Sequence, residues 1–284
     1  MSSIKRDGAV KVGVDLVLVP VTVTDQKDHL VPGLQKDNFD IFYQGEQEVI
    51  RHLSSEDAPI SLGIIFDTSD SMWGKIERSR DAVVQFLRTS NPEDEFFLVG
   101  FNDRPELLVG FTGSVNEIQD AFLKVTPNGT TALFDAIYIG LDQMKKARNK
   151  RTALLIVSDG GDNHSRYTIK EVWSVVREAD VEIYALGIFD QTPRTKAERA
   201  GPDILHAITG VTGGRTFPIY SLNKIGDAIS ELSTELRNQY LIAYQPRVLA
   251  HDGKWHKITV RVTPPRRSLR LRVYARAGYY VPME

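Results

Sequence analysis

The pattern of hydrophobic and polar positions changes character along the chain. Between residues 9 and 57 apolar residues alternate with polar ones, starting with Val10, Val12 and Val14. A period of two predicts β-strands with one solvated face. Pro20 interrupts the longest alternating run, and it indicates a kink or an edge position because proline cannot donate a hydrogen bond to a neighbouring strand. We expect no α-helix before Pro59.

The middle of the chain alternates short apolar runs with amphipathic segments of helical period. This alternation is typical of a parallel sheet covered by helices on both faces. We therefore predict an α/β fold with a doubly wound, mostly parallel, Rossmann-like sheet. The predicted strands are residues 60–66, 96–101, 107–111, 153–157 and 181–188, and the predicted helices are 75–89, 115–124, 132–146, 169–178, 203–209 and 222–237.

The helical period stops after Asn238, and strands are predicted again at residues 240–244, 255–263 and 269–275. Strand-rich segments thus flank the α/β region on both sides. Either the two flanks pair into one β-domain, or each adds separately to the central sheet. We favour the first, because both flanks are half-polar like antiparallel sheets with one solvated face. The expected domains are residues 59–237 and a discontinuous β-sandwich, 9–58 plus 238–282.

Composition narrows the classes of function. The 284 residues carry a net charge of −2, which lacks the basic excess of a dedicated nucleic-acid binder, and they include no cysteine. The absence of cysteine excludes thiolate metal sites and cysteine nucleophiles. The arginine-rich stretch 266–276 has the pattern of a strand face exposed to solvent. No apolar run approaches the ~18 residues of a membrane span. We expect no nucleic-acid partner and no membrane span, and we favour a monomer.

Candidate chemistry lies on three loops. Asp67, Ser69 and Ser71 follow one predicted strand, Thr131 precedes a predicted helix, and Asp159 follows another strand. Ligands of open α/β sheets bind at the carboxyl ends of the strands, where these loops belong. Their carboxylates and hydroxyls are hard oxygen donors, which suit Mg²⁺, with Mn²⁺ or Ca²⁺ also possible.

The order of these residues resembles the metal-ion-dependent adhesion site of von Willebrand factor A (VWA) domains. The matching motifs are Asp67-x-Ser69-x-Ser71, Gly129-Thr130-Thr131-Ala132-Leu133 and Ser158-Asp159-Gly160. The resemblance covers about residues 59–237 and implies a VWA fold. It also implies that Ser69, Ser71 and Thr131 bind the ion directly, whereas Asp67 and Asp159 hold it directly or through water.

The same resemblance implies a metal-dependent protein-binding module. Neutral hydroxyls leave the ion much of its charge, so an Asp or Glu carboxylate of a partner protein can complete the coordination. The sequence departs from the usual pattern of these metal sites at two places. Asp70 occupies a position where the family usually has glycine, and Met72-Trp73-Gly74-Lys75 replaces the acidic pair that supports a second ion in integrin-like sites. We expect one ion.

The flanks are similar to the VWA-related proteins that are abundant in Acidobacteria. The similarity rests on the run at residues 14–25, on Val31-Pro32-Gly33-Leu34, on Glu56-Asp57-Ala58-Pro59 and on Arg276-Ala277-Gly278-Tyr279-Tyr280. Export is common in that group, which implies a secreted or periplasmic location, although these residues alone leave the compartment open.

Two other functions remain open at this stage. One is a Mg²⁺-dependent hydrolase or phosphatase that uses Asp67 or a metal-bound water, with Asp70 or Asp162 as the base. However, the chain has no Gly-x-Ser-x-Gly, phosphate-loop or His-Glu-x-x-His motif, and Ser69 stands where an aspartyl phosphatase would carry a second Asp. The other is an assembly scaffold in which the metal is purely structural.

Overall fold

The most hydrophobic segments of the chain form a central sheet of six strands. The computed structural model describes residues 16–55, 57–247, 252–264 and 270–281. In the sheet order β10-β9-β8-β5-β6-β7, all neighbours are parallel except the antiparallel pair β6 and β7. The strands are β5 (Ile60–Asp67), β6 (Glu95–Phe101), β7 (Pro105–Thr112), β8 (Arg151–Ser158), β9 (Glu182–Ile188) and β10 (Thr216–Ile219).

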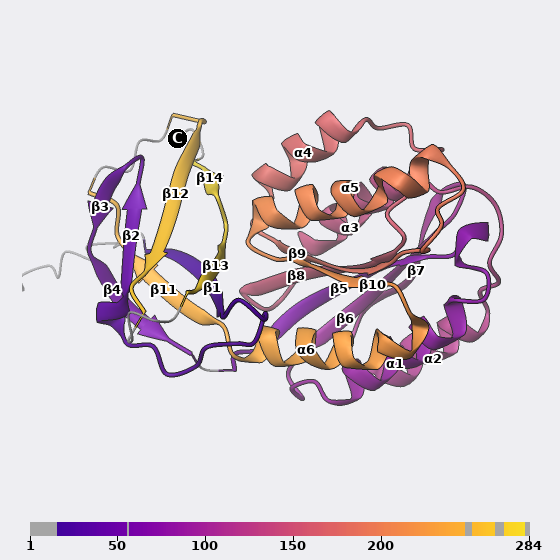
Figure 1. Ribbon diagram of the computed structural model, residues 1–284, viewed down its shortest axis with the longest axis horizontal. Helices are drawn as coiled ribbons and strands as arrows, with labels where there is room; N and C mark the ends of the chain where they lie inside the picture. Colours follow the sequence, from indigo (N-terminus) through magenta and orange to yellow (C-terminus); the bar gives the residue numbers. More distant parts are fainter. Residues whose placement is uncertain (1–15, 56, 248–251, 265–269, 282–284) are drawn as a thin grey trace, which may run out of the picture.

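Three helices cover each face of this sheet (Figure 1). Helices α1 (Ile76–Arg88), α2 (Val115–Leu123) and α6 (Ile225–Arg237) pack on one face, and α3 (Leu133–Met144), α4 (Ile169–Glu178) and α5 (Lys196–Thr212) pack on the other. Every residue of β5 is buried because β5 has strands on both sides and helices on both faces. The predicted doubly wound fold is confirmed.

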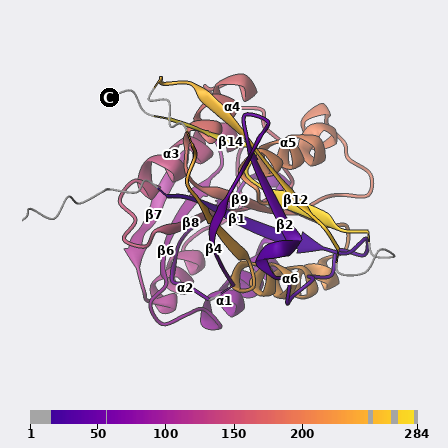
Figure 2. The ribbon, with the colours of Figure 1, turned by 90° about the vertical axis from the view of Figure 1, so that its left-hand side faces the viewer.

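Two antiparallel sheets form a β-sandwich beside this α/β layer (Figure 2). One sheet has the order β13-β1-β11-β4 and the other β14-β12-β2-β3, so each combines strands from both ends of the chain. These strands are β1 (Val17–Thr24), β2 (Phe39–Tyr43), β3 (Glu46–Glu48), β4 (Ile50–Ser54), β11 (Tyr240–Tyr244), β12 (Trp255–Val262), β13 (Arg272–Ala275) and β14 (Gly278–Tyr280). The α/β domain is therefore inserted into the sandwich, as predicted. The limits at residues 59 and 237 stay a prediction.

Several elements differ from the sequence prediction. Strands β10 and β14 were not predicted, because they are short and gain their order from neighbouring strands. Helix α5 begins at Lys196 rather than residue 203, with Thr195 and Glu198 forming a capping box, and it continues through Pro202. The 3₁₀ turn Leu222–Lys224 replaces the first turn predicted for α6. The alternation at residues 10–14 and the start of the strand predicted from residue 269 lie outside the described residues.

Pro20 lies at a local edge, as its chemistry predicts. Strand β1 pairs with β11 over residues 17–21 but with β13 only from Val21 onward. Pro20 therefore belongs to the half of β1 that has one neighbouring strand, the kind of edge position in which proline is tolerated. Within the part of the chain that the structure describes, no helix is long and apolar enough to cross a membrane.

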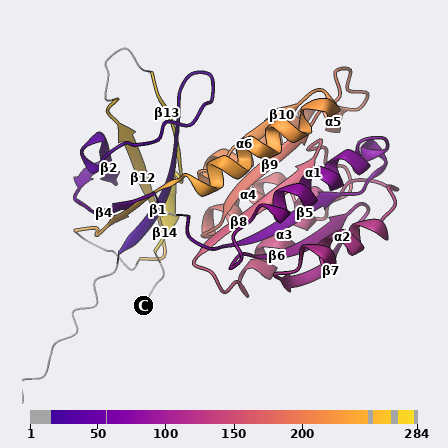
Figure 3. The same ribbon diagram turned by 90° about the horizontal axis from the view of Figure 1, so that it is seen from below.

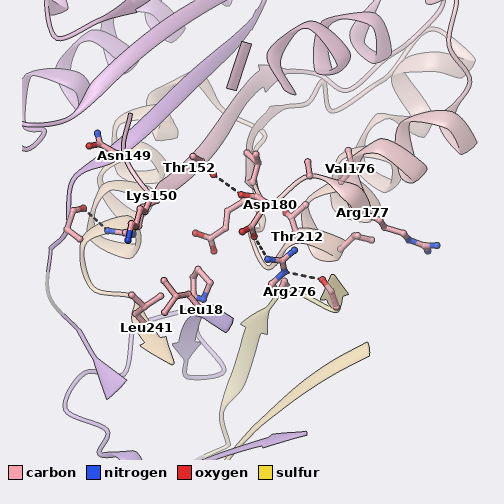
Figure 4. Close-up of a pocket in the computed structure, with 18 of the residues that line it drawn as sticks. Leu18, Asn149, Lys150, Thr152, Val176, Arg177, Asp180, Thr212, Leu241 and Arg276 are labelled. Atoms are coloured by element: carbon pink, nitrogen blue, oxygen red, sulfur yellow. Dashed lines mark hydrogen bonds and ion pairs between the residues drawn. The ribbon is translucent and has the colours of Figure 1, made fainter. Parts of the chain in front are cut away.

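A cavity of about 460 Å³ separates the sandwich from the amino-terminal ends of β8 and β9 (Figure 4). Leu18 and Leu241 line it from the sandwich, and Thr152 lines it from the α/β domain. Arg276 reaches across the junction to pair with Asp180. The Arg276–Asp180 ion pair thus links the two domains beside this cavity.

Glu182, the first residue of β9, is buried at this junction. Its Oε1 accepts a hydrogen bond of 2.9 Å from Gln239 Nε2. The pKa of the Glu182 carboxyl is raised to about 7. Burial is the largest cause and the charge of Glu235 adds to it, whereas the Gln239 hydrogen bond and the charge of Arg151 oppose it. Because its pKa in the folded state exceeds the unfolded value, folded protein binds more protons between these two pKa values.

We expect Glu182→Gln to change how stability depends on pH. In the wild-type protein this group makes stability fall as pH rises from about 4.5 to about 7, and the loss is complete above that window. Removing the charge should raise the free energy of unfolding by at most about 3 kcal/mol at pH 8 and leave it nearly unchanged at pH 4.5. Urea denaturation at both pH values measures this, and an equal effect at both would contradict the assignment.

Candidate metal centre

The Asp67 carboxylate lies at the centre of the site. It ends β5 and is fully buried. Its Oδ1 accepts hydrogen bonds from Ser69 Oγ at 2.6 Å and from the Ser69 N–H at 2.9 Å, and its Oδ2 accepts one from Ser158 Oγ at 2.6 Å. Ser71 Oγ lies 3.0 Å from Ser69 Oγ. The structure thus brings three predicted site residues into direct contact and adds Ser158.

Electrostatics make this position suited to a cation. The pKa of the Asp67 carboxyl is raised to about 7: burial is the largest cause and the negative charge of Asp159 adds to it, whereas the hydrogen bonds from Ser158 and Ser69 oppose it. A buried carboxylate beside a second negative charge favours either a proton or a nearby positive charge. A bound divalent ion would supply that charge.

Asp159 follows β8 and offers an oxygen with no hydrogen-bond partner. Its side chain is buried, and Oδ1 accepts a hydrogen bond from the Gly161 N–H at 3.1 Å. Its Oδ2 is also buried but has no hydrogen bond. Leaving a buried carboxylate oxygen without a donor is costly, so this atom fits a role in holding a cation.

Thr131 lies in a loop that contacts both carboxylate loops. Its carbonyl accepts the N–H groups of Asn163 and His164 in the loop after β8, at 3.0 and 3.1 Å. The preceding Gly129 carbonyl accepts the Asp70 N–H at 3.1 Å. Thr131 itself is 5% exposed, so its hydroxyl belongs to the buried part of this junction. The three predicted loops therefore meet, and whether all five predicted residues bind one ion stays a prediction.

The site lies at the end of the sheet remote from the sandwich (Figure 3). Strand β5 starts where the chain leaves the sandwich, and Phe66 on β5 pairs with Val157 on β8 near their carboxyl ends. Parallel strands end together, so Asp67 and Asp159 come to the same edge. Asp70 and Trp73 are exposed beside it, and Trp73 has 70% of its surface accessible.

The donor set contains few charged groups. Among the described residues, no group of three or more His, Cys, Asp or Glu side chains is placed to hold a metal. A cation at this edge would therefore depend on hydroxyls as well as on Asp67 and Asp159. This mixture of hydroxyl and carboxylate oxygens fits a hard divalent ion.

Two glycines allow the Asp159 loop to pack against α5. A Cβ at Gly201 would lie 2.1 Å from the Asp159 carbonyl oxygen, and a Cβ at Gly160 would lie 2.6 Å from the Gly201 carbonyl oxygen. Gly160 also has a positive φ of 77°, a conformation that side chains disfavour. Sequence reasoning could not identify Gly201, because only the folded structure brings it to Asp159.

We expect Gly201→Ala to displace the Asp159 backbone. It should lower the free energy of unfolding by about 1–3 kcal/mol through overpacking and weaken divalent-ion binding. Gly210→Ala, on the same helix, is the matched control, because a Cβ there meets nothing within 4 Å. The control should raise stability by about 0.4–1 kcal/mol. Urea denaturation and ion titration compare the two, and similar behaviour would refute the packing argument.

Comparison with known proteins agrees with this geometry. Residues 62–161 match the family model described as von Willebrand factor type A domain. The inter-alpha-trypsin inhibitor heavy chain H4 of Bos taurus is 27% identical over 115 residues, covering 36% of this chain and 13% of that protein. Its Homo sapiens counterpart is 23% identical over 141 residues, covering 45% of this chain and 15% of the relative. The chain thus spans only a small part of these relatives.

Solved structures show the same fold. Proximal thread matrix protein 1 from the mussel byssus is 20% identical and has a TM-score of 0.52. The match covers 68% of this chain and 49% of the mussel chain. A second structure of that mussel protein, with a TM-score of 0.51, is described as having a zinc-occupied MIDAS (metal-ion-dependent adhesion site) motif. The D319A mutant of the PilB minor pilin from Streptococcus sanguinis is 12% identical and has a TM-score of 0.53. The match covers 65% of this chain and 63% of the pilin chain. Residues 62–161 are thus similar in sequence to von Willebrand factor type A domains, and the chain shares its fold with these solved structures.

Proposed function

We propose that this protein is a divalent-metal-dependent protein-binding module that captures an acidic side chain of a partner. One observation carries the proposal: Asp67 and the Oδ2 of Asp159, which accepts no hydrogen bond, are buried at one sheet edge beside the hydroxyls of Ser69 and Ser71. Such an arrangement stabilises a cation without neutralising it fully. A bound ion would supply a positive charge with room for one carboxylate from outside.

The residues have distinct roles in this proposal. Ser69, Ser71 and Thr131 bind the ion directly, and Asp67 and Asp159 hold it directly or through water. Asp67 also orients the hydroxyls of Ser69 and Ser158 by accepting a hydrogen bond from each. The exposed Asp70 adds a negative charge at the rim, where it can tighten metal binding or repel an acidic partner.

We propose Mg²⁺ as the resident ion, with Mn²⁺ or Ca²⁺ as alternatives, because the available donors are oxygens. The zinc in the mussel protein supports a divalent cation at such a site and leaves its identity in this chain to experiment. A single ion is proposed. An extracytoplasmic location is also proposed, supported by likeness to a pilin and a byssus protein.

A hydrolase is less well supported by the site. Asp162, one candidate base, accepts hydrogen bonds at Oδ2 from the Phe134 N–H at 3.1 Å and from Ser165 Oγ at 2.5 Å. Phe134 belongs to the first turn of α3, so Asp162 satisfies the start of that helix. A carboxylate engaged in this way is poorly placed to take a proton from water.

The double variant Ser69→Ala/Ser71→Ala tests the interaction module. In pull-downs from native extract, the wild-type chain should retain partners with Mg²⁺ and lose them with chelator, and the variant should retain none in either condition. Ser230→Ala is the matched control, because Ser230 is an exposed helix serine whose hydroxyl donates to the Gly226 carbonyl of its own helix. The proposal would be contradicted if the wild-type chain and the double variant retained the same partners both with Mg²⁺ and with chelator. Turnover of p-nitrophenyl phosphate that disappears in the double variant would favour the hydrolase.

Thermal unfolding with and without Mg²⁺ distinguishes an interaction site from a purely structural metal. A ligand at 100 times its dissociation constant adds about 2.7 kcal/mol to the free energy of unfolding. We expect Mg²⁺ to stabilise the wild-type chain and not the Ser69→Ala/Ser71→Ala variant. If chelation lowers the melting temperature while partner binding persists, the metal is structural and the protein is an assembly scaffold.

A further inference from the structure

Lys75 places an ammonium group beside the candidate metal centre. It is the residue before α1, and its side chain is only 10% exposed. Its Nζ lies 2.9 Å from Asp190 Oδ2, 3.4 Å from the Ile188 carbonyl and 3.9 Å from Asp159 Oδ2. The Lys75 ammonium is therefore the positive charge next to the Asp159 oxygen that lacks a hydrogen bond.

The backbone around Lys75 fixes this position. Its N–H donates to the Met72 carbonyl at 2.9 Å, and its own carbonyl accepts Ser79 Oγ at 2.8 Å. Asp190 is 50% exposed, so it could pair with a lysine at the surface. Instead the lysine is buried between the ends of β8 and β9. Burying an ammonium is costly unless several oxygens surround it, and Asp159 is one of the three that do.

We propose that Lys75 is a built-in counter-cation of the metal centre. Without metal, its ammonium offsets the charge of Asp159 and stabilises the folded site. With metal, the same ammonium opposes the incoming ion, so it lowers the affinity for divalent cations and keeps their binding reversible. This inference rests on the proposed metal site.

Charge and distance support both effects. The ammonium and the proposed ion act on the same Asp159 carboxylate, and like charges a few ångströms apart repel strongly at the low dielectric of a buried site. Salt screens buried groups weakly. Asp190 neutralises Lys75 in part, but it is half exposed and solvent weakens its contribution. Without either cation, Asp67 and Asp159 would be two buried carboxylates with no positive charge at the Asp159 oxygen.

The test uses the full chain and two neutral variants, Lys75→Met and Lys75→Gln, of which the second can still donate a hydrogen bond. Isothermal titration with MgCl₂ or MnCl₂ alone should show binding about tenfold tighter than in the wild-type chain. In chelator, both variants should unfold at lower urea concentration. Lys75→Arg keeps the charge and should restore wild-type behaviour in both measurements. Lys145→Met, which removes an exposed lysine paired with Asp142, is the control and should change neither.

The outcomes separate this inference from the proposed function. If the wild-type chain binds Mg²⁺ and the neutral variants bind it equally or more weakly, the role of Lys75 is overturned and the proposed function stands. If no protein binds either ion, the proposed function fails. A double-mutant cycle of Lys75→Met with Asp159→Asn in chelator then decides the pairing: coupled losses of stability support it, and additive losses overturn it.

Discussion

The buried carboxylate of Asp67 is the constraint on which the functional end of this molecule depends. It ends β5, one of the two central strands of the sheet, and accepts hydrogen bonds from the hydroxyls of Ser69 in the following loop and of Ser158 at the end of β8. The bond from Ser158 joins the ends of β5 and β8, at residues 91 positions apart in sequence. The hydrogen bonds also leave a negative charge inside the protein next to Asp159. The structure around Asp67 must therefore supply positive charge as well as hydrogen bonds.

Packing and charge meet this requirement together. The contact between Gly160 and Gly201 lets the Asp159 loop approach α5 closely enough to bury Asp159. Lys75 then approaches from the amino-terminal end of α1 and provides an ammonium at the edge of the site. A metal ion and this lysine would act on the same carboxylate. Affinity for the ion is then a property of the whole sheet edge and not of its direct ligands alone.

The nested arrangement places this edge away from the sandwich. The chain enters and leaves the α/β domain at the amino-terminal ends of the strands, where Arg276, Asp180 and the buried Glu182 form the junction. The candidate metal centre lies at the opposite ends of the same strands, so a partner can approach it without meeting the sandwich (Figure 3). Carboxylates are buried at both ends of the sheet, and different groups stabilise them. At the junction these groups are Gln239 and arginines, and at the candidate metal centre they are hydroxyls and Lys75.

The sequence by itself determined the layered α/β class, the flanking strands and the three loops that carry Asp67, Thr131 and Asp159. It could do so because strand and helix periods are local, and because residues that follow parallel strands must share an edge. The sequence also favoured pairing of the two flanks, and the tertiary structure confirmed it. Only the tertiary structure decided that β10 and β14 exist and that α5 continues through Pro202. It also placed Lys75, Ser158 and Gly201 around the carboxylates. Their positions depend on contacts between distant segments, and no local pattern records which segments will meet.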